Sequence, residues 1–183
     1  MRKESKMNKF LEGNRIYLRP VEKEDSKILS EWTNDGEIRS ITGEVYPMTE
    51  KGLEEFYEKT QKTEDTIWFV IVDKEKDLVI GETGFLRIFN PWRTADFSII
   101  IGRKEYWGKG IGKEVANLML EYGFNNLNFH RLAIGVVGFN EIGLKFWESI
   151  GFRKEGVQRE GYFYNGKYSD FIMMSLLEDE YRK

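Results

Sequence analysis

The stretch Trp107-Gly108-Lys109-Gly110-Ile111-Gly112 lies where a run of strand-forming residues gives way to a helical pattern. Three isoleucines, Ile99 to Ile101, end the run, and β-branched residues in this density are typical of a strand buried on both faces. Behind the glycines the apolar spacing becomes that of one helix face, on Ile111, Val115, Leu118, Met119 and Tyr122. The sequence therefore predicts a strand that enters a helix through a glycine-rich turn.

Such a turn is suited to an anion, because backbone N–H groups and the positive end of the helix dipole converge there. Glycine at positions 108, 110 and 112 removes the β-carbons that would keep a pyrophosphate from the backbone, and Lys109 and Lys113 add positive charge. A Walker loop needs a Gly-Lys-Ser/Thr ending that is absent, and a dinucleotide fingerprint counted from Gly108 needs glycine where Lys113 stands. The alternative is a tight turn that binds nothing.

The elements expected on either side of the turn alternate irregularly between strands and helices. Strands are predicted at 15–19, 68–72, 78–81 with a possible extension to 88, 95–101 and 132–137, helices around 28–32, 53–57, 111–122 and 142–150, and a hairpin at 162–164 and 167–177. Asn165-Gly166 at the centre of that hairpin is the strongest short turn signal in the chain. The order is mixed, and we expect one domain over 1–183 with a loosely ordered polar segment at 1–12.

Composition excludes several classes of function. With 183 residues, of which 40% are hydrophobic, the chain can bury one sizeable core. A net charge of -3 argues against a nucleic-acid partner and favours a cationic or neutral one. The chain has no cysteine, which excludes a disulfide framework and a cysteine nucleophile. No apolar run approaches the ~20 residues of a membrane span, so we expect a cytoplasmic protein with no membrane partner.

Metal chemistry is not expected either. His130 is the single histidine, it lies just before a predicted strand, and it is interpreted as structural. Without a second histidine or a cysteine, no metal site and no Ser-His-Asp arrangement can be assembled from the sequence.

The glycine-rich turn resembles the Gln/Arg-x-x-Gly-x-Gly/Ala loop of the GNAT superfamily of acetyltransferases, with Trp107 as a departure in the first position. A second motif of that superfamily, Asn-x-x-Ala/Ser-x-x-x-Tyr-x-x-x-Gly-Phe, is matched by Asn140, Gly143, Trp147, Gly151 and Phe152. The resemblance covers nearly the whole chain. The Trp-Gly-Lys-Gly form is similar to the subgroup with ribosomal-protein N-terminal acetyltransferases, and the segments 95–97, 121–124 and 163–168 look like bacterial spermidine N-acetyltransferases.

The resemblance implies an α+β fold with a central mixed, mostly antiparallel sheet of about six to seven strands and four flanking helices. It further implies direct transfer of an acetyl group from acetyl-CoA to a primary amine of a polyamine, a protein N-terminus or another small molecule, without a metal. The aromatic-rich segment 162–168 is a candidate substrate wall or dimer surface, and we expect a homo-oligomer. The residues that it assigns to acetyl-CoA are Ile99, Ile100, Ile101, Trp107, Gly108, Lys109, Gly110, Ile111, Gly112, Lys113, Asn140 and Trp147.

Two carboxylates are candidates for catalysis. The amine arrives as an ammonium with a pKa of ~10 and must lose a proton before it attacks the thioester. Glu82, near the end of a central strand, and Asp96, where the similar enzymes carry an acid, are the candidate bases, although each can also be an ordinary strand residue. Asp96 is a candidate for substrate binding as well, and Glu44 is a candidate for attracting the cation.

Trp147 stands where the superfamily often has a tyrosine that protonates the departing sulfur. Indole cannot do so near neutral pH, but a thiol with a pKa of ~8.5 can leave largely as thiolate. Tyr106, Tyr162 and Tyr168 are alternative acids, and Trp147 is then a wall of the thioester pocket. Two other functions stay open: a module that binds acyl-CoA without turnover, and an acetyltransferase that modifies an antibiotic.

Overall fold

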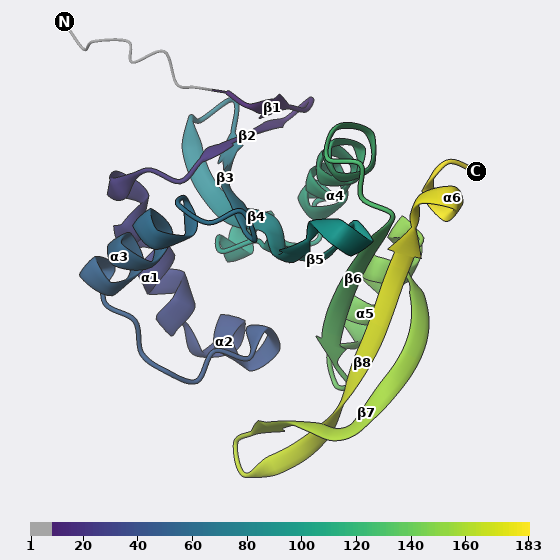
Figure 1. Ribbon diagram of the computed structural model, residues 1–183. Helices are drawn as coiled ribbons and strands as arrows, with labels where there is room; N and C mark the ends of the chain where they lie inside the picture. Colours follow the sequence, from purple (N-terminus) through teal and green to yellow (C-terminus); the bar gives the residue numbers. More distant parts are fainter. Residues whose placement is uncertain (1–8) are drawn as a thin grey trace, which may run out of the picture.

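Residues 9–183, which the computed structural model describes, build one sheet of eight strands in the order β1-β2-β3-β4-β5-β6-β8-β7 (Figure 1). The strands are β1 (Leu11–Glu12), β2 (Ile16–Pro20), β3 (Ile67–Asp73), β4 (Leu78–Phe89), β5 (Thr94–Ile100), β6 (Arg131–Val137), β7 (Arg153–Tyr164) and β8 (Lys167–Leu177). The α-helices are α1 (Ser26–Asn34), α2 (Gly36–Thr42), α3 (Glu50–Thr60), α4 (Ile111–Glu121), α5 (Glu141–Ile150) and α6 (Glu178–Tyr181).

The expected mixed and mostly antiparallel sheet is confirmed, because β5 and β6 form the one parallel pair recorded within residues 9–183. The strand count is slightly higher than expected. Part of the segment predicted to be loosely ordered forms β1, and residues 1–8 of it lie outside the described residues. The two short helices α2 and α6 were not predicted.

The two faces of the sheet carry separate hydrophobic clusters, because side chains alternate between faces along each strand. On β3, Val70 and Val72 face the cluster that α1, α2 and α3 complete. Phe69 and Ile71 face the opposite cluster, to which α4 and α5 contribute. Figure 1 shows α1, α2 and α3 gathered beside β3 and β4, away from α4 and α5. The sheet thus forms the middle layer.

The parallel pair β5–β6 stops early. Its register comprises Thr94 with Arg131, Ala95 with Leu132 and Asp96 with Ala133, and no pairing is recorded beyond. β6 nevertheless continues along β8 as far as Val137, while β5 continues along β4 as far as Ile100. The two strands therefore diverge, as Figure 1 shows. In the part of the chain that the structure describes, no strand pairs with the β6-facing edge of β5 from residue 97 onward.

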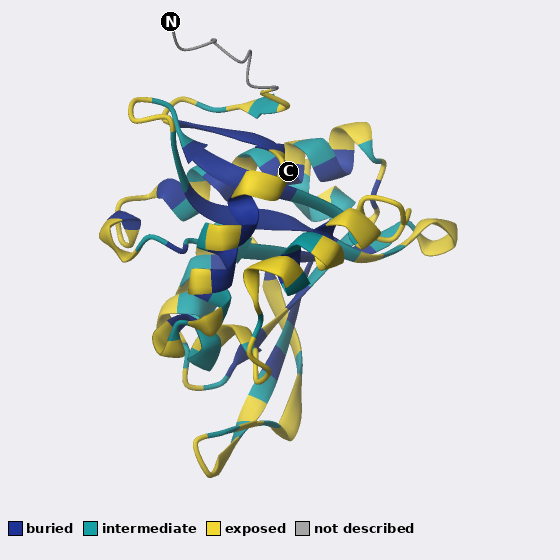
Figure 2. Cartoon of the chain, turned by 90° about the vertical axis from the view of Figure 1, so that its left-hand side faces the viewer, coloured by how far each residue is buried: buried dark blue, intermediate teal, exposed yellow. Residues whose placement is uncertain are grey.

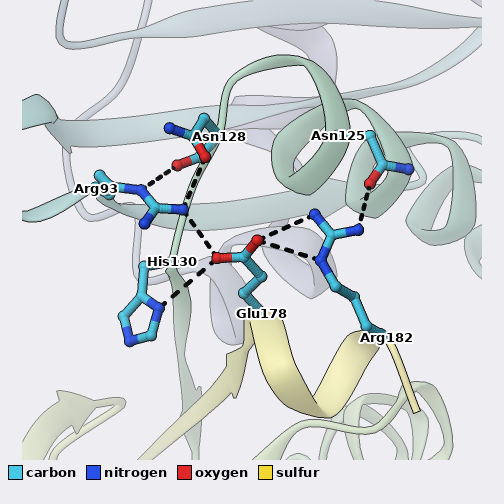
Figure 3. Close-up of polar contacts among 6 residues, drawn as sticks. All are labelled: Arg93, Asn125, Asn128, His130, Glu178 and Arg182. Carbon is cyan, nitrogen blue, oxygen red and sulfur yellow. Dashed lines mark hydrogen bonds and ion pairs between the residues drawn. The ribbon is translucent and has the colours of Figure 1, made fainter.

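A polar cluster joins β5 and β6 at their starts, where the two strands still pair with each other (Figure 3). The backbone carbonyl of Arg93 accepts from His130 N at 2.7 Å, and its guanidinium donates to Asn128 O at 2.7 Å and to Glu178 at 2.8 Å. Glu178 in turn accepts from Arg182 and donates its own N–H to His130 O at 2.8 Å. The start of β5, the start of β6 and the end of β8 are thereby fastened together, with His130 in a structural position.

The β7–β8 hairpin extends well beyond the rest of the sheet, and its tip is exposed (Figure 2). Asn165 and Gly166 form its turn with φ of 49° and 77°, which confirms the predicted hairpin. Tyr162 Oη donates to Ser40 O at 2.9 Å, so the hairpin also contacts α2. No helix of residues 9–183 has both the length and the apolar character that a membrane crossing requires.

Candidate active site

The glycine-rich turn leaves β5 through a 3-10 turn at Lys104–Tyr106 and leads into α4. Trp107 donates its indole N–H to Ile101 O at 2.7 Å, which ties the turn back to the strand end. Gly108 and Gly110 have φ of 69° and 77°, in the left-handed region where a side chain is strained. Glycine is therefore required by the backbone itself, and Gly110 is the N-cap of α4.

The turn offers a continuous series of free backbone donors. Trp107 N donates to Lys104 O at 3.0 Å and Glu114 N donates to Gly110 O at 3.3 Å. Between these two bonds, within the part of the chain that the structure describes, no backbone N–H from Gly108 to Lys113 has an acceptor. Consecutive free N–H groups at a helix N-terminus match the oxygens of a diphosphate. The turn can therefore accept a diphosphate, and its assignment to the pyrophosphate of coenzyme A stays a prediction.

The free edge of β5 adjoins that turn. Ile99 and Ile101 pack against the α4–α5 cluster, and Ile100 packs against the opposite one. Their side chains are partly buried and pack against the two core clusters. Their backbone borders the gap between β5 and β6, where an extended ligand can pair with it as an added strand does. That this ligand is the pantetheine arm stays a prediction.

Trp147 lies in α5, and Asn140 is the N-cap residue of that helix. The Trp147 ring packs edge-on against Phe97 at 5.3 Å and Phe152 at 5.1 Å between ring centroids, and the residue is 9% exposed. This is the packing of a core side chain, and the role of Trp147 as a wall of the thioester pocket stays a prediction. Asn140 Oδ1 accepts from Gly143 N at 2.9 Å, so it caps α5, and its contact with the cofactor stays a prediction.

Glu82 is buried under α3, with 5% of the residue exposed. Tyr57 Oη and, at 2.7 Å, Trp68 Nε1 both donate to its Oε2 atom. Burial raises the pKa of the Glu82 carboxyl, the two donors act to lower it, and the negative charge of Glu44 raises it further. The exposed Glu44 follows α2, so the structure brings two of the three candidate carboxylates into electrostatic contact.

Asp96 has a different environment. It accepts two hydrogen bonds from Arg87, one of them from Nε at 2.6 Å, and its side chain is 30% exposed. Cross-strand pairing sets Asp96 opposite Leu86 and Glu82 opposite Ile100, so the two carboxylates are separated by four residues along β5. That separation is about 13 Å at the rise of a strand. The two cannot serve the same amine nitrogen together.

The three tyrosines that were considered as alternative general acids lie in different parts of the molecule. Tyr106 is buried before the glycine-rich turn, with Lys109 Nζ 6.0 Å from its ring centroid. Tyr162 contacts α2, and Tyr168 lies 65% exposed against Phe163 on the hairpin. Tyr57, which binds Glu82, was expected in a helix but not at the site, since no sequence signal links it to a residue 25 positions away.

Residues 15–153 match the model of the acetyltransferase (GNAT) domain, so the chain belongs to the GNAT superfamily of acetyltransferases and uses acetyl-CoA to acetylate amines. Among its relatives, the spermidine N(1)-acetyltransferase of Vibrio cholerae is 32% identical over 169 residues, which cover 92% of this chain and 96% of that protein. The spermidine N-acetyltransferase crystal structure from Vibrio cholerae in complex with CoA and spermine superposes with a TM-score of 0.87 at 31% identity, covering 92% and 99% of the two chains.

A dodecameric structure of the Vibrio cholerae spermidine N-acetyltransferase is also similar, with a TM-score of 0.79 and 29% identity over 91% of this chain and 96% of that one. These relatives cover 91% to 92% of this chain. Within residues 9–183, no group of three or more His, Cys, Asp and Glu side chains is arranged to hold a metal.

Proposed function

We propose that this chain acetylates a primary amino group of an aliphatic polyamine, with Glu82 as the acceptor of the ammonium proton. The observation that carries the proposal is the buried Glu82 carboxyl, which pairs across the sheet with the free end of β5 at Ile100. Acetyl-CoA supplies the activated acetyl group when it is bound. The free N–H groups from Gly108 to Lys113 hold its pyrophosphate, and the backbone of Ile99 to Ile101 aligns its thioester arm.

The environment of Glu82 supports its role as base. A carboxyl whose pKa is raised toward neutrality holds a proton more firmly, so transfer from an ammonium with a pKa of ~10 costs less. Because Glu82 is only 5% exposed, we assign the transfer to a water between the amine and the carboxyl. The hydrogen bonds from Tyr57 and Trp68 fix the carboxyl and disperse its charge after it loses the proton again.

Asp96 is the weaker candidate, because Arg87 neutralises it and Ile100 lies about 13 Å away along the strand. We interpret Asp96 as a residue that fixes the branch point of β5 and β6, where its register partner is Ala133.

The acceptor class follows from charge and from the relatives. The chain carries a net charge of -3, and Glu44 adds an exposed negative charge near Glu82. A polyamine presents a second ammonium beyond the reacting one, and Glu44 is the candidate partner for that second charge. The relatives named for spermidine and the related structure with spermine support the same class.

The test combines an amine panel with two neutralised variants. Thiol release is measured with polyamines, N-terminal peptides and aminoglycosides, and spermidine is expected to give the highest kcat/KM. Glu82→Gln is expected to lower kcat/KM by about 10²- to 10⁴-fold near neutral pH, with a smaller loss as pH approaches the pKa of the amine. Asp96→Asn is the matched control and is expected to lose much less.

Each competing function has its own outcome. Turnover of aminoglycosides but not polyamines would make the chain an antibiotic-modifying enzyme. Binding of acetyl-CoA without thiol release from any amine would make it a non-catalytic module. Equal activity of Glu82→Gln and the wild type across the pH range would remove Glu82 from the mechanism.

We also propose that the chain forms a homo-oligomer in the cytoplasm, where acetyl-CoA is available. The dodecameric Vibrio cholerae relative supports assembly, and the protruding β7–β8 hairpin with Phe163 54% and Tyr168 65% exposed is the surface that we assign to it. Light scattering after size exclusion is expected to give a mass well above 21.7 kDa. Phe163→Ser with Tyr168→Ser is expected to reduce that mass.

A further inference from the structure

We propose that Arg15 is a positioning residue for coenzyme A. Together with Glu114 it fixes the backbone conformation of the glycine-rich turn. Arg15 lies in the turn between β1 and β2, more than ninety residues before the phosphate-binding turn. It touches neither the free edge of β5 nor Glu82 in the recorded contacts, so its action is exerted through the turn. The inference rests on the use of coenzyme A by this chain.

The side chain of Arg15 contacts both the glycine-rich turn and the first turn of α4. Its Nε donates to Glu114 Oε2 at 2.9 Å, and its Nη1 donates to the carbonyl of Lys109 at 2.9 Å. Its backbone N–H donates to Glu114 Oε1 at 2.7 Å. A β-carbon on Gly110 would lie 3.5 Å from Arg15 Nη2, so the guanidinium borders the turn closely. One side chain thus joins the turn to the first turn of α4.

The bond to Lys109 fixes a peptide plane. In a trans peptide the C=O and the following N–H point in opposite directions. Because the Lys109 carbonyl points at Arg15, the N–H of Gly110 points away from Arg15. Gly110 N–H is one of the free donors assigned to the pyrophosphate. Without Arg15 this peptide can flip, and a flip would present a carbonyl oxygen to the anion in place of an N–H.

The bond to Glu114 removes a charge conflict. Glu114 is an acidic residue in the first turn of α4, where a free carboxylate would repel a pyrophosphate. Although partial burial acts to raise the pKa of Glu114, the hydrogen bonds from the Arg15 backbone and side chain hold it below its usual value. Glu114 is therefore ionised, and Arg15 supplies the positive charge that balances it next to the turn.

Gly13 fits the same arrangement. A β-carbon at this position would lie 2.6 Å from Glu114 Oε1, so a larger residue would displace the carboxylate. The β1–β2 turn thus leaves room for Glu114 on one side and supplies Arg15 on the other. A purely structural tie between this turn and α4 would explain the Glu114 contacts but not the bond to the Lys109 carbonyl.

The experiment measures ligand affinity on the full chain with Arg15→Met, which keeps the aliphatic stem and removes the guanidinium. Calorimetry with free coenzyme A is expected to show about tenfold weaker binding, the effect typical of a lost charge-assisted hydrogen bond. KM for acetyl-CoA is expected to rise by a similar factor with kcat unchanged. KM for acetylpantetheine, a donor that lacks the pyrophosphate, is expected to stay at the wild-type value.

Two further variants complete the design. Arg131→Met removes another arginine–glutamate pair, the one with Glu155 far from the turn, and is expected to leave the affinity for coenzyme A unchanged. Arg15→Met with Glu114→Gln removes the unpaired carboxylate as well and is expected to recover part of the affinity. A folded Arg15→Met protein that binds coenzyme A as tightly as the wild type overturns the proposal, and so does an equal rise of KM for acetylpantetheine. Failure of the proposed function would appear in the wild type instead, as an absence of amine acetylation.

Discussion

At the scale of single residues, burial separates two carboxyls that look alike in the sequence. Glu82 and Asp96 lie on neighbouring strands and on the same face of the sheet. Glu82 is enclosed by Tyr57 and Trp68, whereas Asp96 is paired with Arg87 near solvent. Burial raises the pKa of the enclosed Glu82 carboxyl. Its environment therefore has a consequence for stability that is independent of catalysis.

We expect Glu82→Gln to abolish a pH dependence of stability. Because the pKa of Glu82 is higher in the folded than in the unfolded chain, folding binds a proton, and stability is lost as pH rises from the unfolded pKa through the folded one. Glutamine keeps an acceptor for Tyr57 and Trp68 without the charge. Thermal unfolding from pH 4 to pH 8 is expected to show the variant gaining in Tm relative to the wild type.

An advantage of Glu82→Gln that grows as pH falls would contradict this expectation, since it would mean that the folded state favours the carboxylate. Asp96→Asn serves as the comparison, because it neutralises a carboxylate that accepts from Arg87 in a half-exposed position.

The sequence identified Glu82 and Asp96 as candidate bases from their residue type, but it did not show which residues surround each carboxylate. Tyr57 and Trp68 lie 25 and 14 positions from Glu82, and only the pairing of strands and the docking of α3 bring them together. Arg15 was expected in a strand, and its contact with the carbonyl of Lys109 spans 94 positions. Such non-local contacts have no signature in local spacing. Trp147 was more predictable, because helical spacing already indicated a core side chain.

At the scale of elements, the glycine-rich turn was predictable because its requirements are local. Strand, alternating glycines and helix follow one another directly, and φ at Gly108 and Gly110 shows why glycine stands there. The hairpin at Asn165-Gly166 was predictable for the same reason. In contrast, α2 was missed because its cap, Asp35, accepts from Glu37 N and Ile38 N in a segment with little apolar spacing. Only Ile38 is buried in that helix, so hydrophobic periodicity could not reveal it.

We expect Gly110→Val to prevent binding of coenzyme A in a protein that still folds. A β-branched residue at φ of 77° is strained by about 1–2 kcal/mol, and relief of that strain redirects the N–H groups of the turn. Gly166→Val is the matched control, because Gly166 has the same φ of 77° and no atom within 4 Å of its ideal β-carbon. Calorimetry should show lost affinity in the first variant alone. Equal affinity in both variants would mean that the turn does not hold the ligand.

At the scale of the whole molecule, the gap between β5 and β6 depends on parts of the chain that are far apart. Arg93, His130 and Glu178 fasten the two strands at one end, where they pair from Thr94 to Asp96. Beyond that end β6 follows β8 and β5 follows β4. The sequence predicted both strands, but their divergence could not be derived from it because it is set by pairing with other strands.

The gap has a consequence for the stability of the whole chain. A ligand that pairs with the free edge of β5 and with the N–H groups of the turn binds only when the sheet and α4 are folded, so binding stabilises the fold by linkage. At about 100 times its dissociation constant, coenzyme A is expected to add about 2.7 kcal/mol to the free energy of unfolding. For a chain of this length each kcal/mol raises Tm by about 2–4 °C, so the shift should be about 5–11 °C. Thermal unfolding with coenzyme A, acetyl-CoA and pantetheine measures it.

Pantetheine at the same concentration is expected to give a much smaller shift, because it fills the gap but leaves the turn without an anion. Arg93→Met provides the internal control: it loosens the cluster at the closed end, so it is expected to lower Tm without ligand while keeping most of the shift. If neither coenzyme A nor acetyl-CoA raised Tm of the wild type, the turn and the gap would not form a binding site, and the assignment of both would have to be abandoned.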